Sequence, residues 1–177
     1  MKKVKGISII VLIFIIIYFL QVNFFSWFNI RGIQPNLFII FVLFLGLFIG
    51  NKSGAIGGMI VGTIMDVLVG KTIGFSGFFL ALIGLLAEYF DKNFSKDNRI
   101  MIVVITAIST IFYEIAMYFI VVVQYRIDVE ILPFVVTLAV ETIYNILIVL
   151  CSYQLIKKVG YYLQNIFNNK EFLTRYF

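Results

Sequence analysis

The stretch GAIGGMIVGTIMDVLVGKTIG, from Gly54 to Gly74, decides the fold expected for this chain. Its small residues recur every fourth position, with an aspartate in the one place of the series that lacks glycine: Gly54, Gly58, Gly62, Asp66, Gly70 and Gly74. Residues four apart share one face of an α-helix, so the stretch predicts a groove of bare backbone that contains one carboxylate. In a membrane, such glycines let a neighbouring helix approach closely and pack by van der Waals contact.

The composition indicates a membrane protein. Of the 177 residues, 62% are hydrophobic and 13% are charged, whereas soluble domains average about 45–50% apolar and 25% charged residues. The absence of histidine and the single cysteine, Cys151, exclude histidine-based metal sites, histidine general bases and an internal disulfide. We expect no metal and no cofactor. The net charge of +5 follows the membrane topology and does not indicate a nucleic-acid partner.

The apolar runs predict an all-α bundle of six transmembrane helices in one integral membrane domain. The expected spans are 7–28, 35–50, 54–69, 75–90, 100–123 and 131–156. The first span is an uncleaved helix and not a signal peptide, because no small-residue cleavage site follows it. Pro35 fits the opening of the second span, where a missing N–H costs nothing.

Two of these spans, 35–50 and 54–69, are short for a bilayer. Each is about 24 Å long, against a hydrocarbon core of about 30 Å. They are therefore either buried among longer helices, which we favour, or form a partly re-entrant hairpin. The tail 157–177 predicts an amphipathic helix at the cytoplasmic membrane surface, and a frayed tail is the alternative.

The positions of the basic residues predict that both termini are cytoplasmic. With the N-terminus inside, only Arg31, Lys71 and Arg126 of the 14 basic residues fall outside, as the positive-inside rule predicts. Losing or adding one span would place the basic loop 91–99, the tail or the N-terminus on the wrong side.

Acidic side chains within the spans are the candidate functional groups. Asp66, Glu114 and Glu141 all fall in the expected outer half of the membrane, and no Lys or Arg lies inside a span to pair with them. A charged side chain costs about 2.5–3.5 kcal/mol at a helix centre, so we expect these acids to face the protein interior. The glutamates belong to two polar stripes with four-residue spacing: Thr106, Thr110 and Glu114, and Thr137, Glu141 and Asn145.

These stripes have three interpretations. We favour hydrogen bonds that fix helix packing, over a contact with a partner protein and over a small-molecule site. An intramembrane aspartyl protease would need two facing aspartates, and only Asp66 qualifies within the spans.

Three groups of residues together suggest a known family: Pro35, Asn36 and Leu37, then Gly57, Gly58, Gly62, Asp66, Gly70 and Gly74, then Pro133 and Asn145. With these residues the chain resembles MreD, the bacterial family of rod shape-determining membrane proteins. The resemblance covers nearly the whole chain, although the sequence KTIG, which ends at Gly74, lacks the proline that the family often has before that glycine. The resemblance implies a non-enzymatic plasma-membrane subunit of the cell-elongation machinery, which pairs with MreC and supports cell-wall synthases in peptidoglycan synthesis.

The resemblance also implies a six-helix fold like that of the substrate-binding subunits of energy-coupling-factor vitamin transporters. Such a subunit is the alternative function, because it holds a small vitamin in an outer-half cavity. These subunits typically carry small residues, often Ala-x-x-x-Ala, on their first helix, and the span 7–28 contains no alanine. This difference favours the scaffold function, with lipid bilayer, MreC and cell-wall synthesis proteins as partners, and leaves a homo-oligomer open.

Overall fold

A computed structural model of the protein describes residues 2–50, 52–69, 74–93, 98–126 and 128–167. In this part of the chain every named element is helical, and the only β feature is an isolated bridge between Ile30 and Ile33. The elements are α1 (Lys2–Phe19), the π-helix η1 (Leu20–Phe24), α2 (Phe25–Trp27), α3 (Leu37–Phe48), α4 (Ser53–Val69), α5 (Phe75–Asn93), α6 (Arg99–Tyr125) and α7 (Ile131–Phe167). Because α1, η1 and α2 are continuous, the described chain forms six helical segments, and the all-α prediction is confirmed.

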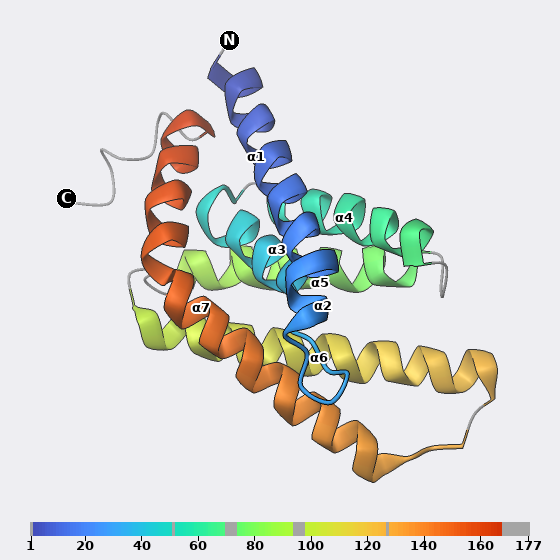
Figure 1. Ribbon diagram of the computed structural model, residues 1–177. Helices are drawn as coiled ribbons and strands as arrows, with labels where there is room; N and C mark the ends of the chain where they lie inside the picture. The colour runs from blue at the N-terminus through green and yellow to red at the C-terminus, as the bar shows by residue number, and fades with distance from the viewer. Residues whose placement is uncertain (1, 51, 70–73, 94–97, 127, 168–177) are drawn as a thin grey trace.

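The centre of the molecule is α3. All 12 of its residues are buried, and it contacts α1, α4, α5, α6 and α7 (Figure 1). Its apolar sequence, LFIIFVLFLGLF, suits a position with no lipid-facing or water-facing side. At about 18 Å it is too short to span a bilayer by itself, but a helix enclosed by protein does not need to match the hydrocarbon thickness.

Among the described elements, α4 and α5 form the pair with the most extensive packing. The glycines of α4 explain why these two helices approach so closely. A Cβ atom added to Gly54 would lie 2.8 Å from the carbonyl oxygen of Gly84 on α5, and one added to Gly58 or Gly62 would overlap the α5 backbone at Leu80 or Gly77. The two backbones therefore touch along the glycine face of α4, a contact that side chains would prevent.

The opposite face of α4 is exposed, which differs from the expectation that both short helices are buried. Ile56, Met59, Ile60 and Val67 are each more than half exposed. The physical reason is that α5 occupies the glycine face, so the large apolar side chains between the glycines point outward. Of the two short helices, α3 is the one enclosed on all sides in the described part of the chain.

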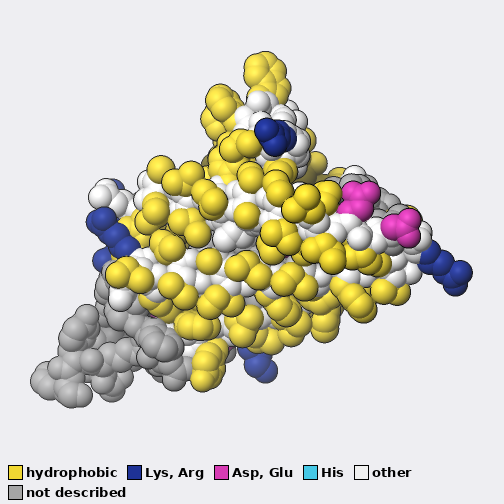
Figure 2. Space-filling model, turned by 90° about the horizontal axis from the view of Figure 1, so that it is seen from below, with side chains coloured by type: hydrophobic (Ala, Val, Ile, Leu, Met, Phe, Trp, Pro, Cys, Tyr) yellow, Lys and Arg dark blue, Asp and Glu magenta, His cyan; other side chains and the backbone are white. Residues whose placement is uncertain are grey.

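The later helices alternate in direction. Figure 1 shows α4, α5, α6 and α7 running in alternate directions, whereas α1 and α2 cross over α4 and α5. Three helical stretches in the described residues are long and apolar enough to cross a membrane, namely Lys2–Trp27, Arg99–Tyr125 and Ile131–Phe167. Figure 2 shows a largely hydrophobic face with charged side chains near its ends, as expected for a protein in lipid.

The helix α7 is one uninterrupted element of 37 residues, about 55 Å long, and it bends along its length (Figure 1). The expected separate tail helix is therefore the continuation of α7 as far as Phe167, while residues 168–177 lie outside the described residues. Its last turns pack on the core: Gly160 contacts Phe48, Leu163 is fully buried, and Phe167 contacts Gly6.

Candidate functional site: the polar contacts and cavity near the start of α3

The start of α3 is held by side chains from two distant helices. The Gln21 side chain donates from Nε2 to the Pro35 carbonyl oxygen, at 2.8 Å, and its Oε1 accepts from the Leu37 N–H, at 2.9 Å. The Asn36 side chain accepts from the Ile39 N–H at 3.4 Å, so it caps α3. Helix α3 thus begins at Leu37 and not at Pro35, because Asn36 has the extended conformation of an N-cap.

The fully buried Asn145 of α7 completes this arrangement. Its Oδ1 accepts from the Asn36 N–H at 2.8 Å, and its Nδ2 donates to the Thr110 hydroxyl of α6 at 3.0 Å. One amide therefore connects α7, α6 and the backbone at the start of α3. The residues Pro35, Asn36, Leu37 and Asn145, singled out in the sequence as separate motifs, form one hydrogen-bonded unit in the structure.

Gln21 is a residue that sequence reasoning missed. It lies within the π-helix η1, and it is only 7% exposed although the surrounding run is apolar. A lone polar residue in an apolar membrane run is a recognisable signal. The π-turn shifts the residues after it relative to α-helical spacing, so the face on which Gln21 lies does not follow from a period of 3.6.

Asp66 caps the helix that packs beside it. Its Oδ2 accepts from the Gly74 N–H at 2.8 Å and from the Ser76 N–H at 3.1 Å, both at the start of α5. The first N–H groups of a helix lack intrahelical partners, and a carboxylate there satisfies them and interacts favourably with the helix dipole. Asp66 is 4% exposed and lies on the same face of α4 as the glycines. Its hydrogen bonds hold the start of α5 against this face.

Replacing Asp66 by Asn is expected to be mild, because both hydrogen bonds use one oxygen atom that an amide oxygen can replace. Asp66→Ala removes that acceptor from the Gly74 N–H and from the buried Ser76 N–H, at a cost of about 1–2 kcal/mol. Thermal unfolding of the purified protein in detergent measures the loss of stability in each of the two variants. A loss for Asp66→Asn as large as that for Asp66→Ala would show that the charge, and not the acceptor, is what the fold requires.

The remaining members of the glycine series differ in role. Gly74 has a φ of +92°, and nothing lies within 4 Å of an added Cβ, so it serves the turn before α5 and not helix packing. Gly57, which is part of the family resemblance, faces the Leu45 side chain. Gly70 lies outside the described residues.

Glu88 was also missed, although it falls within the expected span 75–90. It is 9% exposed, and its Oε2 accepts from the Lys52 N–H at 2.8 Å. The turn between α3 and α4 is therefore bound by an acid of α5, just as the start of α5 is bound by Asp66 of α4. Each end of the α4–α5 pair has one buried carboxyl group on a backbone N–H.

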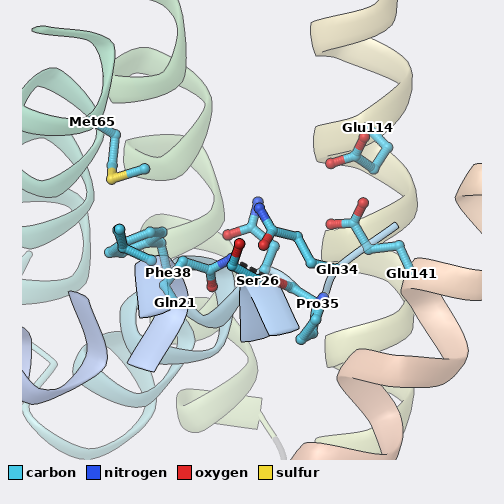
Figure 3. A pocket seen from close by; sticks show the side chains of 10 residues that line it. Gln21, Ser26, Gln34, Pro35, Phe38, Met65, Glu114 and Glu141 are labelled. Carbon is cyan, nitrogen blue, oxygen red and sulfur yellow. Dashed lines mark hydrogen bonds between the residues drawn. The ribbon is translucent and has the colours of Figure 1, made fainter. Parts of the chain in front are cut away.

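Glu114 of α6 and Glu141 of α7 come together. Their carboxyl groups point towards one another (Figure 3). Next to Glu114, Tyr113 is buried, and so is Ser76 at the start of α5. The two polar stripes predicted from the sequence therefore face each other, at Glu114 with Glu141 and at Thr110 with Asn145.

A cavity of about 380 Å³ lies beside these groups. Its lining comes from η1, α2, the segment before α3, α3, α4, α6 and α7, and includes Gln21, Asn36, Glu114 and Glu141 (Figure 3). It joins the start of α3 to the paired glutamates, so the sequence-predicted residues of helices far apart in the chain meet around one space. Asp66 does not line it.

Comparison with known proteins gives one match. A family model described as rod shape-determining protein MreD matches residues 1–159. No curated protein and no solved structure gives a significant match.

Proposed function

Because the chain belongs to the MreD family of rod shape-determining proteins, we propose that it is a non-enzymatic integral membrane subunit of the machinery that elongates rod-shaped bacteria. In this proposal the chain binds MreC and the associated cell-wall synthases, and so regulates cell shape through peptidoglycan synthesis. The observation that carries the proposal is the family match over residues 1–159.

The proposed topology has six spans in the bacterial plasma membrane, with both termini in the cytoplasm. Two features support it. The helices α4, α5, α6 and α7 alternate in direction (Figure 1), and with the N-terminus inside only Arg31, Lys71 and Arg126 of the 14 basic residues fall outside. The positive-inside rule favours this orientation. The cavity beside Glu114 and Glu141 then lies in the outer half of the membrane.

The scaffold role depends on packing. The backbone contact between α4 and α5 fills the glycine face, so MreC meets a surface that this contact shapes and does not meet the glycines themselves. Such a surface is rigid, because close backbone packing and the buried Asp66 and Glu88 hydrogen bonds fix both ends of the α4–α5 pair. A rigid surface loses little conformational freedom when a partner binds.

Gly62→Leu tests this role. The leucine side chain overlaps the α5 backbone at Ser76 and Gly77, so the α4–α5 pair separates or shifts. We expect a several-fold lower yield of MreC when tagged chain and MreC are co-expressed and co-purified, and rounded cells when this variant is the only copy in a rod-shaped host. Met59→Leu, at an exposed position of α4, is the matched control and leaves both unchanged. Normal complex yield and normal cell shape for Gly62→Leu would contradict the proposal.

A second candidate is the vitamin-binding subunit of an energy-coupling-factor transporter. The cavity of about 380 Å³ favours it, because small-molecule sites are typically about 300–1,000 Å³. Purification separates the two candidates: a single-span partner with a periplasmic domain supports the cell-shape function, whereas a bound vitamin or an ATPase module supports the transporter.

A further inference from the structure

The cavity beside Glu114 and Glu141 is lined by acidic side chains without basic ones, among the residues that the structure describes. Both ends of the Gln21 amide are used by Pro35 and Leu37, and the Asn36 oxygen is used by Ile39. The polar side chains left for a ligand are the neutral Ser26 and Gln34 and the acidic Glu114 and Glu141, whose carboxyls Figure 3 shows projecting from α6 and α7. The described lining residues include no Lys or Arg.

These carboxyls have unused acceptor capacity. Glu141 is 7% exposed, and its carboxyl group faces that of Glu114. An ionised carboxylate only accepts hydrogen bonds, so the facing oxygen atoms cannot satisfy one another. A buried oxygen without a donor is unfavourable, so these oxygens favour a ligand that donates hydrogen bonds.

We propose that this cavity binds one ammonium or guanidinium group on a short aliphatic stem. Two carboxylates that face each other repel, and one such cation between them offsets that repulsion. The apolar wall formed by Val22, Phe38 and Met65 suits the methylene groups of the stem.

A divalent metal ion fits this wall less well. Ca²⁺ takes six to eight oxygen ligands, and the described residues contain no group of three acidic or metal-ligating side chains. The ligand group has two sources, a free small amine or a Lys or Arg side chain of a partner protein. The second source rests on the proposed function.

The test uses the purified full-length chain in lipid nanodiscs with n-butylammonium as the probe. A ligand that binds only the folded state raises the unfolding midpoint, and we expect a saturable rise of about 5 °C or more. Neutral n-butanol and anionic butyrate, of similar size, give no saturable rise. The proposal is overturned if n-butylammonium and n-butanol change the midpoint equally.

Substitutions test whether the rise in the unfolding midpoint depends on the cavity. The double variant Glu114→Gln/Glu141→Gln keeps the shape of both side chains and loses the response, whereas Glu130→Gln, which removes an exposed acid just before α7, keeps it. Should the double variant fail to fold, Val22→Trp supplies a second test, because Val22 lines the cavity, is 48% exposed and leaves both acids in place. An undiminished response in the folded double variant or in Val22→Trp overturns the proposal.

The complex with MreC distinguishes the two sources. If a partner side chain fills the cavity, the purified complex no longer responds to n-butylammonium while the free chain does. If the natural ligand is a free amine, the complex and the free chain respond alike. Co-purification of MreC is measured separately from the response to n-butylammonium. Failure to bind the cation contradicts the proposal for the cavity, whereas failure to bind MreC contradicts the proposed function.

Discussion

Gly58→Ala is expected to destabilise the protein by about 3 kcal/mol, although it adds a single methyl group. The added Cβ overlaps the Leu80 carbonyl group on α5, and the neighbouring Ala81 nitrogen is at 2.8 Å. These are backbone atoms of a packed helix, so the overlap is relieved only by moving α4 away from α5. Thermal unfolding in detergent, followed by circular dichroism, measures the loss.

The adjacent Gly57 gives a matched control on the same helix. A Cβ there meets only the end of the flexible Leu45 side chain, at 2.5 Å from Cδ1, and alanine favours a helix by about 1 kcal/mol over glycine. Gly57→Ala is therefore expected to be neutral or slightly stabilising. Equal losses for the two variants would mean that the glycines act through helix propensity and not through contact with α5.

Asn145→Ala is expected to cost about 3 kcal/mol. The change leaves the Asn36 N–H without its acceptor and the Thr110 hydroxyl without its donor, and each buried unsatisfied group costs about 1–3 kcal/mol. The start of α3 then loses its link to α7, so amide exchange should also quicken at Asn36. Unfolding in detergent and hydrogen exchange at Asn36 are the two measurements.

Asn23→Ala is the control for the same chemical change. Asn23 is exposed and bonds only to the Phe19 carbonyl of its own helical run, so its loss should be below about 0.5 kcal/mol. Thr110→Val isolates the second contact of Asn145. The double variant Asn145→Ala/Thr110→Val should be less destabilised than the sum of the single changes. Strict additivity would show that the Asn145–Thr110 bond contributes nothing.

Much of the fold could be predicted from residue spacing. The apolar runs located all six helical segments, because each run is long and bounded by polar or glycine-containing turns. The four-residue glycine spacing identified a bare face on α4. It could not identify which helix meets that face, because spacing within one helix contains no information on its neighbour. The structure shows that the neighbour along Gly58 and Gly62 is α5, which contributes Gly77 and Gly84 to the contact, and that Gly46 of α3 also meets Gly54.

The candidate site was less predictable, for reasons specific to its residues. Asp66 binds the backbone at the start of a helix that begins nine residues later, and backbone N–H groups leave no mark in the sequence. Glu88 likewise binds a backbone N–H, of Lys52. The pairing of Glu114 with Glu141 requires a particular rotation of α6 against α7, and two separate polar stripes allow that rotation without requiring it.

The enclosure of α3 has a consequence for biosynthesis. It is made early in translation, yet the amide of Asn145 that secures its first turn belongs to the last helix, 109 residues later. Closing so long a loop is slow, so a nascent chain passes through a stage in which the most apolar segment lies against lipid or an insertion chaperone. Ribosome stalling before α7 emerges would therefore leave an immature product, and membrane proteases could recognise it by its uncovered central helix.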